Sequence, residues 1–259
     1  MLADDLARAL DPVWLARDAG IDPDDWQARV LRSSARQIIL NCARQSGKST
    51  ISAILGLHMA VYTPRSLTLL LARKLDQAKE LFLKMKVPFH DMEMPPAEIE
   101  QESAIRVELD NGSRIIALPG KAEGLRGFSA VNLLICDEAA YIPDPTYYSV
   151  RPMLATSNGR IVIMSTPFGR RGFFHETWAN GGTAWHRELI PATQVPRISA
   201  AFLAEERRAL GVWYAQEYEN AFLDNQFAVF GYDTVMAALS DKVQPLFGGQ
   251  QHGEIHARA

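Results

Sequence analysis

Short apolar runs alternate with amphipathic stretches along much of this chain. The runs span residues 37–40, 66–72, 131–136 and 159–164. Their length and their aliphatic and β-branched residues are typical of buried strands. After the first run, apolar residues recur at helical spacing from Ile51 to Tyr62. Strands that alternate with helices predict an α/β fold with a mainly parallel central sheet flanked by helices, in which ligands bind at the carboxyl ends of the strands.

Turn residues predict a hairpin in the middle of the chain. An alternating stretch at 105–109, the tight-turn sequence Asp110-Asn111-Gly112 and a returning strand at 113–118 have the pattern of a β-hairpin. An amphipathic helix from about 74 to 86 is expected before it. The prolines and acidic residues of 88–101 then predict a loop.

The pattern divides the chain into three parts. Residues 1–35 predict an N-terminal extension of helical segments broken by turns. Residues 36–235 are expected to form the main α/β domain, with an edge strand at 185–190 and a helical stretch at 200–223. Residues 236–259 predict a frayed tail or the start of a linker.

The sequence Asn-Cys-Ala-Arg-Gln-Ser-Gly-Lys-Ser-Thr occupies residues 41–50, between the first strand and its helix. This order is the one that a phosphate-binding loop requires, with backbone N–H groups and the helix dipole facing an anion. Lys48 would reach the β- and γ-phosphates, and the Ser49 hydroxyl would ligate Mg²⁺. The expected nucleotide contacts are Arg44, Gln45, Ser46, Gly47, Lys48, Ser49 and Thr50. The general pattern asks for glycine where this chain has Cys42, so an ordinary strand-to-helix turn is the alternative.

Polar residues also follow two of the other predicted strands. Asp137 suits the carboxylate that holds Mg²⁺, and Glu138 can act as a general base that polarises a water for attack on the γ-phosphate. The alternative is that Asp-Glu only ends a strand and solvates a loop. Ser165 and Thr166 follow the last run. Because all these polar segments fall at strand ends, together they favour ATP hydrolysis.

Trp26 and Gln27 begin a short helix predicted after Pro23. Their position ahead of the first strand would place an aromatic ring and an amide against an adenine base. A core tryptophan beside a solvated glutamine is the alternative, and the residues alone favour it.

Composition narrows the class of protein. The 259-residue chain, with 47% hydrophobic and 22% charged residues, has the composition of a soluble globular protein. Its net charge of −3 provides no global basic field, so any contact with nucleic acid must use a local patch. The N-terminus lacks a signal-peptide pattern, and the apolar runs are too short to span a bilayer. Two cysteines are typical of a reducing compartment, so we expect a cytoplasmic protein without membrane contact.

Taken together, these motifs resemble the ATPase domain of the large terminase subunit of tailed phages. The matching segments are Trp26–Gln27, Arg44–Ser49, Gly124–Gly127, Ile135–Ala139, Ser165–Pro167 and Tyr218–Phe222. The Arg-Gln pair in the loop, and a residue other than glycine at Cys42, are typical of that family. In the family, Trp26-Gln27 corresponds to the adenine-side motif. The resemblance covers about residues 10–235.

The resemblance implies a RecA-like fold of the ASCE class of P-loop NTPases, in which the strand before Ser165 lies between the loop strand and the strand before Asp137. It also implies a motor that uses ATP and Mg²⁺ to translocate double-stranded DNA into a viral procapsid in the host cytoplasm. The portal protein and the small terminase subunit are the implied partners. A homo-oligomeric ring is the expected active form, and the isolated chain is compatible with a monomer.

The same strand order has two consequences. Ser165 and Thr166 would lie beside the γ-phosphate and pass the signal of hydrolysis onward, unless they only cap the next helix. Cys42 and Cys136 would lie two strand spacings apart, roughly 9–10 Å. A disulfide needs Cα atoms closer than about 7 Å, so both cysteines are expected to be free, buried thiols.

Arg126 lies in the Gly-rich loop that matches the Arg-Gly loop of the family. In a ring, it would enter the neighbour's ATP site and stabilise the charge on the transferring phosphoryl group. Arg44 is the rival, because it already lies in the phosphate loop of the same subunit. A third possibility is that Arg126 makes only a structural hydrogen bond.

Family members usually continue into a nuclease domain with clustered acidic residues. The short stretch after Asp233 has no second α/β pattern, so no nuclease activity is expected. The chain would then be a truncated piece, a split gene product or a packaging ATPase without its nuclease. A helicase-type ATPase would need a second RecA-like domain, for which this chain is too short. A nucleotide-gated assembly protein that does not hydrolyse ATP is disfavoured by Glu138.

Overall fold

Helices and strands alternate along the chain in a computed structural model that describes residues 2–92, 95–120, 125–224, 234 and 237–238. Residues 1–223 form one compact unit, and residues 224–259 form a second. In the second unit, the described positions 234, 237 and 238 are helical. The elements below belong to the first unit.

The strands are β1 (Gln37–Cys42), β2 (Leu67–Ala72), β3 (Ile99–Glu102), β4 (Arg106–Leu109), β5 (Arg114–Pro119), β6 (Leu133–Asp137), β7 (Arg160–Ser165) and β8 (Trp185–Ile190). The α-helices are α1 (Leu2–Leu10), α2 (Pro12–Asp18), α3 (Asp25–Arg32), α4 (Lys48–Tyr62), α5 (Leu75–Asp91), α6 (Asp144–Val150), α7 (Gly172–Asn180), α8 (Ala200–Leu210) and α9 (Trp213–Glu217). The 3₁₀ turns are η1 (Leu125–Gly127), η2 (Ala139–Tyr141), η3 (Arg151–Leu154) and η4 (Ala192–Gln194).

One mixed sheet joins all these strands in the order β3-β4-β5-β2-β6-β7-β1-β8. The pairs from β5 to β8 are parallel, and the β3–β4 and β4–β5 pairs are antiparallel. The predicted α/β fold, its mainly parallel sheet, the 105–118 hairpin and the edge position of β8 are therefore confirmed. β7 lies between β1 and β6, which is the order that the family resemblance implied.

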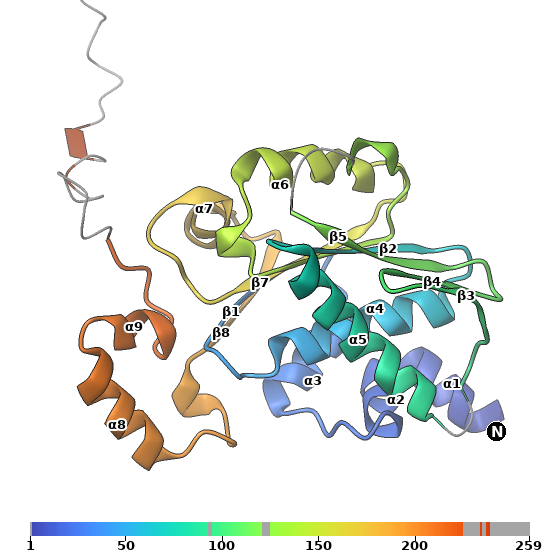
Figure 1. The fold of residues 1–259 in the computed structure, drawn as a ribbon, viewed down its shortest axis with the longest axis horizontal. Helices are drawn as coiled ribbons and strands as arrows, with labels where there is room; N and C mark the ends of the chain where they lie inside the picture. Colours follow the sequence, from blue (N-terminus) through green and yellow to red (C-terminus); the bar gives the residue numbers. More distant parts are fainter. Residues whose placement is uncertain (1, 93–94, 121–124, 225–233, 235–236, 239–259) are drawn as a thin grey trace, which may run out of the picture. The chain divides into compact units, whose positions relative to one another are not determined.

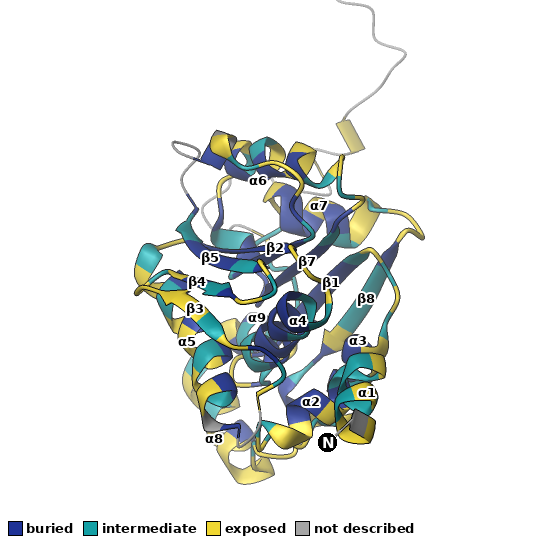
Figure 2. Cartoon of the chain, turned by 90° about the vertical axis from the view of Figure 1, so that its right-hand side faces the viewer, coloured by how far each residue is buried: buried dark blue, intermediate teal, exposed yellow. Residues whose placement is uncertain are grey.

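Helices cover both faces of the sheet, and the alternation of side chains along each strand explains why (Figure 1). In β1, Ile38 and Leu40 join the core under α2 to α5, whereas Ile39 joins the core under α6 and α7. The helix α4 is buried along most of its length, as its dark blue colour in Figure 2 shows. This burial fixes the start of α4 at the carboxyl end of β1, where the Gly-Lys-Ser-Thr sequence lies. None of the described helices has the length and hydropathy of a membrane span.

The loop predicted for 88–101 is wrong at both of its ends. The helix α5 continues through Pro88 to Asp91, and β3 begins at Ile99. Helix packing accounts for the first difference, since Phe89 is 5% exposed and extends the buried face of α5 past the proline. The second arises because β3 pairs with β4 as an edge strand whose exposed glutamates resemble loop residues in sequence.

The single helical stretch predicted for 200–223 is also wrong. The structure has two helices, α8 and α9, which are interrupted at Gly211 with a φ of 53°. The chain leaves helical geometry after Tyr218, and Asn220 adopts a φ of 60°. A left-handed residue cannot continue an α-helix, so each of these positions ends a helix that the apolar pattern alone would extend.

Cys42 and Cys136 are free and buried, as predicted. Burial raises the pKa of each thiol to about 12 from an ordinary value of 9.0. Between these values the folded state binds more protons than the unfolded state, so stability should fall as the pH rises from about 9 toward 12. At pH 8, a thiol-reactive reagent should label the folded chain far more slowly than the denatured chain. Denatured protein supplies the control with two reactive thiols, and fast labelling of either cysteine in the folded chain would contradict this account.

Candidate nucleotide site

The phosphate loop connects β1 to α4 and has backbone geometry that few residues accept. Gln45 and Gly47 have positive φ values of 58° and 91°. A Cβ atom at position 47 would lie 2.5 Å from Nε2 of Gln27, so only glycine allows this close approach. The loop ends where α4 begins at Lys48, so the first backbone N–H groups of a long buried helix face this end of the sheet.

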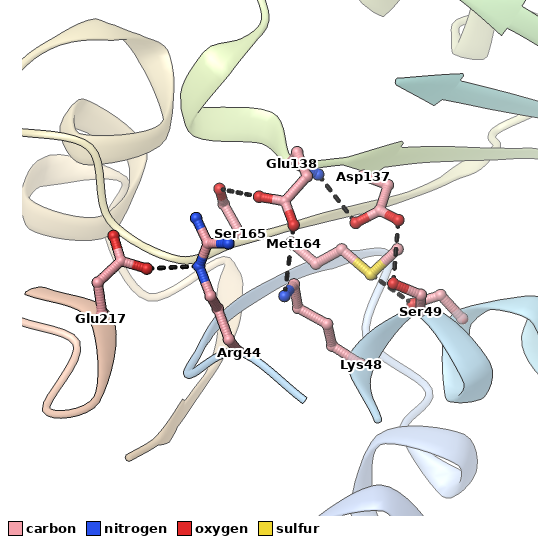
Figure 3. A network of polar contacts seen from close by, with 9 residues as sticks. Arg44, Lys48, Ser49, Asp137, Glu138, Met164, Ser165 and Glu217 are labelled. Carbon is pink, nitrogen blue, oxygen red and sulfur yellow. Dashed lines mark hydrogen bonds and ion pairs between the residues drawn. The ribbon is translucent and has the colours of Figure 1, made fainter. Parts of the chain in front are cut away.

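Ser49 and Asp137 meet across the gap between α4 and β6. The Ser49 hydroxyl donates a 3.0 Å hydrogen bond to Oδ2 of Asp137 (Figure 3). Hydroxyl and carboxylate oxygens are ligands that Mg²⁺ accepts, and Mg²⁺ sites on nucleotides need only one or two protein ligands. These two side chains therefore fit the predicted metal. Among the described residues no cluster of three or more His, Cys, Asp or Glu could hold an ion by itself, which agrees with a site that phosphates must complete.

Glu138 lies at the centre of the polar network in Figure 3. Its Oε1 is 3.6 Å from Nζ of Lys48, and its Oε2 accepts a long, 3.5 Å hydrogen bond from the Ser165 hydroxyl. Its backbone is left-handed, with φ 49° and ψ 44°, and its N–H donates to Oδ1 of Asp137 at 2.9 Å. This conformation costs a non-glycine residue about 1–3 kcal/mol and is a form of strain that clusters at functional sites.

Arg44 leaves the phosphate loop toward the C-terminal helices. Its guanidinium pairs with the carboxylate of Glu217 at the end of α9, and that hydrogen bond raises the pKa of Arg44. Burial and the charges of Glu217 and Glu138 raise the pKa of Tyr141, and Arg44 opposes them. Arg44 therefore lies near the catalytic candidates, but its charge is directed to Glu217.

An aromatic stack joins the ends of β6 and β7. Tyr141 and Phe168 stack with ring centroids 4.3 Å apart. The guanidinium of Arg73 lies 5.8 Å from the Tyr141 centroid, and that of Arg171 lies 4.6 Å from the Phe168 centroid. Thr166 is buried and hydrogen-bonds Tyr141. These contacts connect the strand end that carries Glu138 to the strand end that carries Ser165.

The adenine-side candidates lie on α3 and differ from each other. Trp26 is 4% exposed, packs in the core and also lines a cavity of about 400 Å³ with Pro23, Arg29, Gln194 and Pro196. Gln27 is also buried, and its amide contacts the phosphate loop.

The structure brings together Lys48, Ser49, Asp137, Glu138 and Ser165. Ser46 is buried in the loop, Gln45 is exposed, and Thr50 lies in the first turn of α4. The side chain of Arg126 and most of its loop lie outside the described residues, although the backbone of Leu125–Gly127 forms η1.

Two contacts of this site had no signal in the sequence. Glu217 and Arg197 reach the loop from 173 and 151 residues away, from exposed segments without periodicity. A third contact was suggested by the segment Tyr218–Phe222. There the Asn220 amide donates 2.8 Å hydrogen bonds to the carbonyls of Asn41 and Ile190, which attaches this segment to the carboxyl ends of β1 and β8.

The sheet order, the loop before α4 and the opposing Asp137-Glu138 pair define an α/β protein of the phosphate-loop class. The chain belongs to the family described as "Terminase large subunit, T4likevirus-type, N-terminal", which matches residues 39–230.

Similar proteins agree with this family. The chain is 25% identical over 248 residues to the "Terminase, large subunit" of Thermus phage G20c, which covers 82% of this chain and 51% of that protein. The relative from Thermus virus P23-45 matches to the same extent. The chain thus spans about half the length of the curated relatives it matches.

Solved structures share the fold. The large terminase ATPase domain of Thermus phage P74-26 matches with a TM-score of 0.71 at 21% identity, over 80% of this chain and 97% of that one. The large terminase of another thermophilic bacteriophage, in complex with ATP-γ-S, matches with a TM-score of 0.65 at 12% identity, over 77% of this chain and 52% of that one. The RecA-like fold expected from the motifs is therefore confirmed.

Proposed function

We propose that this chain is an ATP-hydrolysing motor domain that drives double-stranded DNA into a viral procapsid. The observation that carries the proposal is the pair of contacts Ser49–Asp137 and Lys48–Glu138, which lie side by side between α4 and the end of β6. Family membership supports the packaging role, and relatives named as large terminases and as a complex with ATP-γ-S support the nucleotide.

In the proposed reaction, Lys48 exchanges Glu138 for oxygens of the β- and γ-phosphates. Glu138 is then free to accept a proton from the attacking water, at a position that Ser165 and the N–H bond to Asp137 help to fix. Ser49 and Asp137 would hold Mg²⁺, which bridges phosphate oxygens and offsets their charge when bound.

The proposed assembly extends beyond this chain. Residues 36–235 form the proposed ATPase domain, with 1–35 as its adenine-side extension and 236–259 as a tail or linker. Its proposed partners are double-stranded DNA, the portal protein and the small terminase subunit, in a homo-oligomeric ring in the host cytoplasm. Ser165 and Thr166, joined to the Glu138 strand end through Tyr141 and Phe168, would pass the state of the γ-phosphate onward.

The proposal is tested by ATP turnover with Mg²⁺, with and without double-stranded DNA and portal protein. We expect hydrolysis that DNA and portal increase, and we expect Lys48→Ala to weaken ATP binding because it removes the cation that faces the phosphates. Binding is measured by calorimetry and turnover by phosphate release. Arg32→Ala removes an exposed cation that pairs with Asp11 rather than with the loop, and it serves as the control. Lack of ATP binding by the unmodified chain would contradict the proposal.

A further inference from the structure

The outer side of the phosphate loop is held by two side chains. The carbonyl oxygen of Ser46 accepts hydrogen bonds from Nε2 of Gln27 at 3.3 Å and from Nη2 of Arg197 at 3.2 Å. Gln27 belongs to α3, whereas Arg197 lies between η4 and α8. Two elements from opposite ends of the chain therefore converge on one peptide group.

Both donors are themselves fixed by Asp24. Arg197 makes a bidentate pair with this carboxylate, with distances of 3.1 Å and 2.8 Å, and the Asp24 side chain is only 16% exposed. The Asp24 N–H donates to Oε1 of Gln27 at 2.8 Å, so the Gln27 amide nitrogen is turned toward Ser46. A bidentate arginine pair has defined geometry, so the third contact of Arg197, to Ser46, is directed rather than incidental.

The position of this carbonyl also sets the direction of the next N–H group. A trans peptide is planar, and its C=O and N–H bonds point in opposite directions. Because the Ser46 carbonyl points outward to Gln27 and Arg197, the N–H of Gly47 points to the opposite side. Hydrogen bonds to a peptide carbonyl also polarise its N–H, and a charged donor does so more strongly.

We propose that Arg197 is a positioning residue that, with Asp24 and Gln27, holds the Ser46–Gly47 peptide so that its N–H is presented to the phosphates of the nucleotide. This inference rests on the proposed function, and it assigns Arg197 to the phosphate loop rather than to recognition of the base. It also makes phosphate affinity depend on the segment before α8.

The test compares Arg197→Ala with Arg32→Ala. Arg32 lies on α3, the helix that carries Gln27, and pairs with Asp11; its side chain is 55% exposed against 54% for Arg197. The two variants therefore remove similar surface ion pairs, but only one pair contacts the loop. Calorimetric titrations with ATP and with inorganic pyrophosphate, each with Mg²⁺, separate binding of phosphate from binding of the base.

We expect Arg197→Ala to raise the Kd of ATP and the Kd of pyrophosphate by a similar factor of about 10, as for the loss of a charged hydrogen bond. The KM for ATP should rise with them while kcat changes less, since the loop binds phosphate before and during the reaction. Arg32→Ala should leave both Kd values unchanged while its Tm changes by a similar amount. Asp24→Asn keeps a good helix N-cap and should raise both Kd values by a smaller factor, so it serves if Arg197→Ala fails to fold.

Three results would count against the inference. Unchanged Kd values in Arg197→Ala would remove Arg197 from the loop's function, and a weaker ATP complex with unchanged pyrophosphate binding would assign it to the base. Equal losses in Arg197→Ala and Arg32→Ala would show a general effect of α3 stability. If the unmodified chain bound neither ligand, the proposed function itself would fail, so the two failures are distinct.

Discussion

Glu138→Gln is expected to lower kcat for ATP hydrolysis by about 10²–10⁴-fold while ATP still binds. The amide has the shape of the carboxylate but does not accept a proton from water. It can keep the neighbouring contacts, because Ser165 and Lys48 are donors that an amide oxygen can also accept. Phosphate release under saturating ATP measures kcat, and calorimetry with ATP and Mg²⁺ measures binding.

Glu176→Gln gives a control for the loss of one negative charge, because Glu176 is an exposed residue of α7 outside the polar network. It should turn over ATP as the unmodified chain does. If Glu138→Gln kept full turnover, another group would have to be the base. If it lost ATP binding as well, the Lys48–Glu138 contact would be part of loop stability rather than of the chemical step.

The sequence predicted the β5-to-β8 part of the sheet well, because buried strands leave long apolar runs that need no partner to be recognised. The order of β6, β7 and β1 came from the family resemblance and not from any local pattern. Where polar and apolar signals conflicted, the prediction failed. Pro88 and the surrounding acidic residues indicated a loop, but the buried face that includes Phe89 extended α5 past them.

The site was predictable where its residues follow strands directly. Lys48, Asp137 and Glu138 are placed by the strand that precedes each of them, so local sequence is sufficient. Arg197 and Glu217 depend on contacts between exposed segments far apart in the chain, which leave no periodic signal. Gln27 is intermediate, since its role was left open between an adenine contact and a solvated side chain, and the structure instead directs its amide to the Ser46 carbonyl.

The identity of the arginine that stabilises the transferring phosphoryl group is still a choice between Arg126 and Arg44. Arg44 lies near Glu138, but its guanidinium is paired with Glu217 and its side chain is 64% exposed. To act within its own subunit it would have to leave that carboxylate. Arg126 lies in the turn η1 ahead of β6, and we propose that a ring would insert it into the neighbour's site.

If Arg126 acts between subunits, Arg126→Ala should lower kcat by about 10³–10⁵-fold, the effect of such an arginine in other phosphoryl-transfer enzymes. Specific activity of the unmodified chain should rise with protein concentration, because the complete site forms only on assembly. Mixing Arg126→Ala with Glu138→Gln should restore turnover, since some interfaces then pair an intact Glu138 with a neighbour's intact Arg126. Mixing Arg44→Ala with Glu138→Gln is the matched control, and it should give no rescue if Arg44 serves only its own site. Turnover that does not depend on concentration, together with no rescue in the first mixture, would assign the role to Arg44 and would require the Arg44–Glu217 pair to open when ATP binds.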